Sequence, residues 1–114
     1  MRAAMDSAPL EVWHDVITRY PDMRCWVAHN KTVPCEILAI LAVDKSSDVR
    51  HSVAMKNKLP FELMLLLADD DDEIVRQRIA HNKNAPIDAL RKLATDQCPG
   101  IAEVAQRRLA ILGL

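Results

Sequence analysis

Apolar residues recur along the chain at helical spacing, and the arrangement as a whole repeats every 26 residues. The clearest copy is DVRHSVAMKNKLPFELMLLLADD at 48–70, in which a short apolar-faced segment, a polar break and a proline precede a longer apolar-faced segment. Similar copies lie at 22–44 and 74–96. Arginine and proline mark equal positions in the three copies: Arg24, Arg50 and Arg76, and Pro34, Pro60 and Pro86. A period this regular predicts a repeat protein in which each unit packs on its neighbours.

The spacing of the apolar residues predicts an all-α fold without strands. Each copy contributes one short and one longer helix, and the longer helix begins with proline at its first position, where the missing N–H costs nothing. Residues 9–20 form an N-terminal cap helix, residues 99–112 form a C-terminal cap helix, and residues 1–8 are a lead-in. The chain is therefore predicted to be a single helical-repeat domain over 1–114, an α-solenoid of about three full 26-residue repeats between two capping half-repeats. Whether the short segments are α or 3₁₀ helices stays open.

Each helix is expected to turn one apolar face inward. In the longer helices the inward residues are Ile37, Leu38 and Leu41, then Leu63, Met64 and Leu67, then Leu90, Leu93 and Ala94. In the short segments they are Met23, Val27 and Ala28, then Val49, Val53 and Ala54, then Val75, Ile79 and Ala80. The caps use Leu10, Trp13, Val16, Ile17 and Tyr20 at one end, and Ile101, Val104, Ala105, Leu109 and Leu112 at the other. In the C-terminal cap, Glu103, Gln106, Arg107 and Arg108 are expected to face outward.

Two kinds of polar residue recur where helices end. Asp44, Asp70 and Asp96 close the longer helices, and a short carboxylate in a turn accepts backbone N–H groups. Asn30 and Asn82 follow the short segments and are expected to adopt the left-handed conformation that asparagine shares with glycine at helix ends. In the middle copy Lys56 takes that position.

The string Pro-x-x-x-Leu-x-x-Leu-Ala-x-Asp, followed by Val-Arg-x-x-Val-Ala-x-Asn, resembles the leucine-rich repeat variant family, a relative in architecture of HEAT repeats. The resemblance covers roughly residues 9–96. It implies a right-handed superhelix of alternating long α-helices and short 3₁₀-like helices, and a scaffold rather than a reaction. The founding member of the family also carries a cysteine-rich iron–sulfur segment, and this chain has no such cluster, so no cofactor is expected.

Charge and composition give no sign of an anionic partner. The chain of 114 residues carries 15 basic and 16 acidic side chains, a formal net charge of −1, which is an ordinary surface without the basic footprint of nucleic-acid binding. No run of about 18 uncharged apolar residues is present, and the start lacks the apolar region of a signal peptide. Cys25, Cys35 and Cys98 are odd in number and scattered, which indicates a reducing, cytoplasmic location.

The arginines at the repeat position allow two interpretations. A row formed by Arg24, Arg50 and Arg76 suits a phosphate backbone, as in HEAT-like enzymes of DNA repair. The structural interpretation, which we favour, pairs each arginine with a turn carboxylate such as Asp22, Asp44, Asp48 or Asp70.

No other pattern predicts chemistry. His29 and His81 are two repeats apart, on the order of 20 Å at the usual helix spacing, and zinc bonds of about 2.0–2.3 Å exclude a shared ion. The acidic run 69–73 lacks the alternating ligands and glycine of a calcium loop. It is expected to be a solvated turn that caps the next helix, with a recognition patch for a basic partner as the alternative.

No nucleophile stands beside a base, and the serines, Ser52 among them, are expected in turns or at the surface. We therefore expect neither an enzyme nor a metal site.

A protein-binding module or adaptor is the leading functional prediction, for instance one that neutralises or regulates a bacterial protein. The residues expected to contact the partner are Trp26, His29, His51, Lys56, Arg78 and His81, with Cys25 and Gln77 beside them. Trp26 is either an exposed anchor for the partner or packs over Trp13 or Tyr20. Nucleic-acid binding through the arginine row is the alternative function. The sequence of residues 101–114 is apolar at its end, which predicts a weak homodimer through the C-terminal helix. The alternative is a monomer in which this tail folds back over the last groove.

Overall fold

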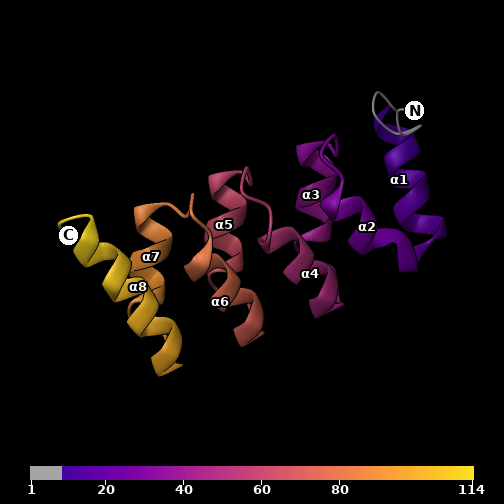
Figure 1. Ribbon diagram of the computed structural model, residues 1–114. Helices are drawn as coiled ribbons and strands as arrows, with labels where there is room; N and C mark the ends of the chain where they lie inside the picture. Colours follow the sequence, from indigo (N-terminus) through magenta and orange to yellow (C-terminus); the bar gives the residue numbers. More distant parts are fainter. Residues whose placement is uncertain (1–8) are drawn as a thin grey trace. The chain divides into compact units, whose positions relative to one another are not determined.

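The computed structural model describes residues 9–114, and every regular element in that range is a helix. The elements are α1 (Leu10–Arg19), the 3₁₀ helix η1 (Pro21–Met23), α2 (Arg24–His29), α3 (Cys35–Leu41), α4 (Ser47–Ala54), α5 (Phe61–Leu67), α6 (Glu73–His81), α7 (Ile87–Leu93) and α8 (Pro99–Ile111) (Figure 1). The predicted all-α class is confirmed. The lead-in predicted for residues 1–8 lies outside the described residues. Within 9–114, none of the helices combines the length and the apolar character that crossing a membrane requires.

Residue contacts divide the chain into two compact units, one ending at Val53 and the other beginning at Ala54. In unit 1, α1 contacts α2 and α3. In unit 2, α5 contacts α6 and α7, and α8 packs against both α6 and α7. The single domain over 1–114 stays a prediction.

The repeat prolines stand one residue before the helices they introduce, so the prediction that they occupy the first helical position is wrong. Pro34 has ψ 150° and Pro86 has ψ 157°, which is extended backbone. The carbonyl of Pro34 nevertheless accepts the N–H groups of Ile37 and Leu38, both at 3.1 Å. Each proline is thus the N-cap, and its fixed φ prepares the turn into the helix.

The predicted alternation of long and short helices is also wrong. The helices after the prolines, α3, α5 and α7, have 7 residues each, whereas α4 has 8 and α6 has 9. The helices after the prolines end early because the Leu-Ala-x-Asp segment closes in a tighter turn, in which the Asp44 N–H donates to the Leu41 carbonyl at 3.1 Å. Of the short segments, only Pro21–Met23 is 3₁₀ in the described part of the chain.

The inward faces follow the predicted pattern with four errors. In the N-terminal cap, Leu10 is 36% exposed at the first residue of α1, and Tyr20 is 53% exposed because it lies beyond the end of that helix. Most of the predicted residues are buried, and Val27, Ile37, Leu41, Val53, Met64, Leu67, Val75, Ile79, Leu90 and Leu93 are fully so. Met23 is 37% exposed because it belongs to η1 rather than to α2, and Leu112 is 57% exposed because α8 ends at Ile111. The sequence analysis missed Val33 and Leu59, which lie 26 residues apart, precede the repeat prolines and close the core beneath the loops.

Candidate functional site

The repeat arginines are held by carboxylate and carbonyl oxygens inside each unit. In unit 1, Arg24 donates from Nη1 to Asp44 Oδ2 at 3.0 Å and from Nε to the Ile17 carbonyl at 2.8 Å. In unit 2, Arg76 donates from Nε to Asp96 Oδ2 at 2.8 Å. Both pairs join residues 20 apart in sequence, so the same pairing of arginine with aspartate recurs at the same repeat position, although the donor atom differs. This geometry is the one that the structural interpretation of the arginines requires.

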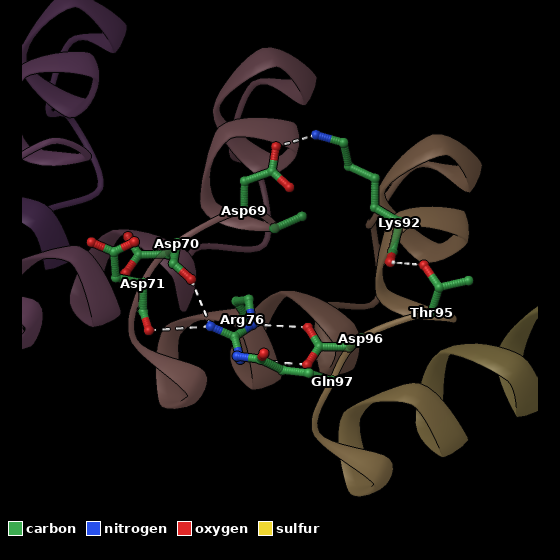
Figure 2. Close-up of a pocket in the computed structure, with 9 residues that line it drawn as sticks. Asp69, Asp70, Asp71, Arg76, Lys92, Thr95, Asp96 and Gln97 are labelled. Atoms are coloured by element: carbon green, nitrogen blue, oxygen red, sulfur yellow. Dashed lines mark hydrogen bonds and ion pairs between the residues drawn. The ribbon is translucent and has the colours of Figure 1, made fainter.

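Two of the repeat arginines, Arg50 and Arg76, also donate to carbonyls of the preceding turn. Arg50 Nη1 donates to the Asp44 carbonyl at 2.6 Å in unit 1, and Arg76 Nη1 donates to the Asp70 carbonyl at 2.7 Å in unit 2. Arg76 also contacts the Asp71 carbonyl at 3.2 Å, and Figure 2 shows its guanidinium between those carbonyls and Asp96. A planar guanidinium with five N–H donors in a fixed geometry can serve several acceptors at once. Arg76 on α6 therefore holds together the turn at Asp70 and Asp71 and the turn at Asp96.

The turn aspartates are confirmed as acceptors of backbone N–H groups. The Oδ1 atoms of Asp44, Asp70 and Asp96 accept from the residue two positions later, at 2.9, 2.9 and 2.8 Å. Asp44 and Asp96 direct the other oxygen, Oδ2, to an arginine. Each of these carboxylates thus closes a turn with one oxygen and anchors a helix with the other.

The Arg76–Asp96 pair is nearly enclosed, with side chains only 9% and 6% exposed. Burial by itself raises the pKa of Asp96. Hydrogen bonds from Arg76 and from the Cys98 N–H, with the charge of Arg76, outweigh burial and hold that pKa below its ordinary value. The bond to Asp96 correspondingly raises the pKa of Arg76. The pair is charged at neutral pH.

We expect the Asp96 pair to make unit 2 sensitive to acid. The unfolded carboxyl has a pKa of about 3.9, and the folded value is lower. The contribution of Asp96 is therefore complete above the unfolded pKa and disappears as the pH falls through the folded pKa. Urea unfolding between pH 6 and pH 2 should show a midpoint that falls less steeply in Asp96→Asn than in the wild type. The exposed Asp15→Asn variant is the control, and equal slopes in all three proteins would contradict the expectation.

Asn82 and Arg108 make a further set of hydrogen bonds that recurs with the repeat, which the sequence did not predict. We call this set the second ladder, the first being the bonds of the repeat arginines. Asn82 Nδ2 donates to the carbonyls of Lys56 at 2.8 Å and Ala54 at 3.3 Å, which lie 26 and 28 residues earlier. Arg108 Nη1 donates to the carbonyls of Asn82 and Ala80, both at 2.7 Å and again 26 and 28 residues earlier. The prediction that Arg108 faces outward is therefore wrong. The sequence did contain the signal, because Asn30, Lys56, Asn82 and Arg108 hold one repeat position and all carry side-chain N–H donors.

The left-handed conformation predicted for the asparagines is wrong as well. Asn30 has φ −69° and Asn82 has φ −68°, both extended. Their side chains bridge the turn instead: Asn30 Oδ1 accepts from the Thr32 N–H, and Asn82 Oδ1 accepts from the Asn84 N–H at 2.9 Å. At Asn82 the amide nitrogen donates twice and the amide oxygen accepts once, so its polar atoms have partners although the side chain is buried.

Replacing Asn82 by alanine should lower the free energy of unfolding by about 1–3 kcal/mol, the cost of leaving buried carbonyls without a donor. Asn82 is 5% exposed, so water cannot replace its amide. The control is Asn84→Ala, whose exposed amide donates to the Asn57 carbonyl and whose loss should change stability by less than about 0.5 kcal/mol. Urea unfolding decides the matter, and equal effects of the two variants would show that the second ladder does not support the fold.

The acidic run is part of the framework too. Asp72 is the N-cap of α6, with Oδ1 accepting the Ile74 N–H at 2.8 Å, as predicted. Asp69 pairs with Lys92 across a hollow of about 490 Å³ whose floor is the Arg76–Asp96 pair (Figure 2). Glu73 accepts the Cys98 thiol at 3.0 Å, which raises the pKa of that thiol.

The residues predicted to bind a partner divide into exposed and half-buried sets. Trp26 is 44% exposed, and His29 beside it on α2 is exposed, so Trp26 does not pack away as the alternative required. Arg78 and His81 are exposed on α6, and with Ile74 and Gln77 they line a hollow of about 360 Å³.

The middle copy differs. His51 and Lys56 are half-buried, and burial lowers the pKa of Lys56. Ser52, which shares the repeat position of Trp26 and Arg78, is 6% exposed and donates to the Asp48 carbonyl at 3.0 Å, so its predicted surface position is wrong.

Residues 9–114 bring together no group of three metal-ligating side chains. Comparison of the chain with protein-family models, with curated proteins and with solved structures finds no match.

Proposed function

We propose that the protein is a non-enzymatic, protein-binding helical-repeat module whose partner contacts the exposed faces of α2 and α6. One observation carries the proposal. Trp26 and His29 in unit 1 hold the same two repeat positions as Arg78 and His81 in unit 2, and all four side chains are exposed. Large aromatic and guanidinium side chains supply most of the energy at protein interfaces.

We also propose that the repeats stack as a right-handed α-solenoid related to the leucine-rich repeat variants. The support is the recurrence of equivalent bonds: Arg24–Asp44 in unit 1 matches Arg76–Asp96 in unit 2 at one repeat position. Such stacks offer an extended face on which neighbouring repeats can contact one partner. We place this function in a reducing compartment such as the cytoplasm, because the three cysteines, Cys25, Cys35 and Cys98, are odd in number and scattered along the sequence.

Nucleic-acid binding through the arginine row has weaker support. Arg24 and Arg76 direct their guanidinium groups to carboxylates and carbonyls of the same unit, and a phosphate would have to displace those oxygens. A gel-shift assay at low salt with Arg24→Ala tests this rival. A shift that depends on Arg24 would favour nucleic-acid binding over our proposal.

Affinity capture from a lysate of the source organism tests the protein-binding function. The Trp26→Ala, Arg78→Ala double variant removes the two large exposed side chains, and the Arg19→Ala, Arg91→Ala double variant removes two exposed arginines elsewhere. We expect one partner protein to be retained by the wild type and by the control pair, and lost with the Trp26 and Arg78 pair. Retention of the same proteins by all three baits would refute the proposed face.

The C-terminal helix supports a weak homodimer, which we propose as a separate property. Ile111, Leu112 and Leu114 are 79%, 57% and 55% exposed, so the tail does not fold back over a groove. Sedimentation of the wild type against an Ile111→Glu, Leu114→Glu variant tests the pairing. We expect a larger weight-average mass for the wild type at tens of micromolar, and two monomeric proteins would contradict it.

A further inference from the structure

The exposed face of α6 has a chemistry of its own. Ile74, Gln77, Arg78 and His81 are spaced i, i+3, i+4 and i+7, which places them on one side of the helix, and they line the hollow of about 360 Å³. Ile74 is 55% exposed in the first turn of α6 and supplies the apolar part of that hollow. The hollow is therefore apolar at the N-terminal end of α6 and rich in N–H donors at the C-terminal end.

From this arrangement we infer that the α6 face binds a protein segment that presents an apolar side chain to Ile74 and a carboxylate to Arg78 and His81. The inference rests on the proposed protein-binding function and names the partner's chemistry. Charge complementarity favours a carboxylate on the partner, because two of the four lining residues are basic and none is acidic. The hollow over Arg76 in the same unit has the opposite character, with four aspartates among the residues that line it.

The spacing along α6 limits the partner's motif. At 1.5 Å per residue, Arg78 stands about 6 Å and His81 about 10 Å along the axis from Ile74. A carboxylate and an apolar residue four positions apart on a helix, or two to three apart on a strand, match that separation. A short acidic segment of the form Leu-x-x-x-Glu is thus sufficient to span the face.

A protein segment fits this face better than a nucleic acid. A phosphate chain that followed α6 toward its N-terminus would reach Asp71, Asp72 and Glu73, which directly precede Ile74. Like charges would repel each further phosphate there. A peptide carries its charge at chosen positions and can place an uncharged side chain beside that acidic turn.

The basic side chains on α6 also have an ordinary structural role, because Arg78 and His81 occupy the last turn, where cations favour the helix dipole. The test must separate binding from stability. Arg91 is a matched control, since it is an exposed arginine in the last turn of α7 in the same unit.

Titration followed by amide NMR of the full chain provides the test. The probes are three blocked peptides, Leu-Ala-Ala-Ala-Glu-Glu, the same peptide with lysine in place of glutamate, and the peptide with glutamine, together with a single-stranded oligonucleotide. We expect shifts at Ile74, Arg78 and His81 with the glutamate peptide alone. Because a charged hydrogen bond is lost, Arg78→Glu should weaken that binding at least about tenfold, and Arg91→Glu should leave it unchanged.

Each other outcome overturns the inference. Shifts on α6 with the lysine or glutamine peptide would show a docking face that does not select carboxylates, and the protein-binding function would stand. Shifts with the oligonucleotide and not with the glutamate peptide would mean that the α6 face binds a nucleic acid and not an acidic protein segment. No binding of any probe would remove the inference, while affinity capture by the exposed faces would still decide the proposed function independently.

Discussion

Replacing Arg76 by alanine should lower the free energy of unfolding by about 3–5 kcal/mol, the usual cost of removing one partner of a buried ion pair. Three features support an effect of this size. The pair with Asp96 is nearly enclosed, two further carbonyls lose their donor, and Asp96 is left as an unpaired buried charge. Urea unfolding followed by circular dichroism measures the change. Because natural domains have only about 5–15 kcal/mol of stability, the variant should unfold at far lower urea.

Arg19→Ala is the matched control for that experiment. Arg19 pairs with Asp15 at 2.9 Å, but the two side chains are 69% and 53% exposed, and such surface pairs contribute about 0–1 kcal/mol. A double variant, Arg76→Met with Asp96→Leu, should restore only part of the stability, because the Cys98 N–H and the turn carbonyls still lack partners. If Arg76→Ala remains within about 1 kcal/mol of the wild type, the repeat arginine does not hold unit 2 together.

The second large effect is expected at Trp13. Its side chain is 1% exposed in the core of unit 1, and replacing a buried tryptophan by alanine costs about 3–5 kcal/mol through lost burial and the cavity left behind. Trp26 is the natural comparison, since it is 44% exposed on α2. Trp26→Ala should change stability by no more than about 0.5 kcal/mol and should instead weaken binding of the partner.

Within unit 1, the Trp13 variant is thus expected to lower stability, and the Trp26 variant is expected to weaken partner binding. Urea midpoints of both variants, measured alongside affinity capture, give the result. A Trp26→Ala protein as unstable as Trp13→Ala would mean that Trp26 belongs to the framework and that the proposed binding face has lost its largest side chain.

The sequence predicts those parts of the fold in which one residue type recurs at one repeat position. The inward Leu, Ile and Val residues and the turn aspartates are such cases, because a helix face and an Asx turn each depend on local spacing. The pairing of Arg24 with Asp44 also follows from the repeat, since both residues recur.

The remaining errors have physical causes. Asn82 and Arg108 occupy one repeat position and both donate N–H groups to earlier carbonyls, although asparagine is short and neutral and arginine is long and charged. The difference in residue type concealed this equivalence in the sequence. The proline position differs by one residue because the N-cap carbonyl already accepts helical bonds. Exposure at the binding positions depends on packing that no local pattern encodes, as buried Ser52 and exposed Arg78 show at a single repeat position.

The central claim is that the exposed faces of α2 and α6 bind a protein, and site-specific photo-cross-linking tests it most directly. A photoreactive phenylalanine analogue is placed at Trp26, at His81, or at one of two control positions, Phe61 and Arg91, which are exposed on α5 and α7. After irradiation in lysate, we predict that positions 26 and 81 become joined to the same partner protein and that the control positions do not. Cross-links that form equally from all four positions, or only from the controls, would contradict the account.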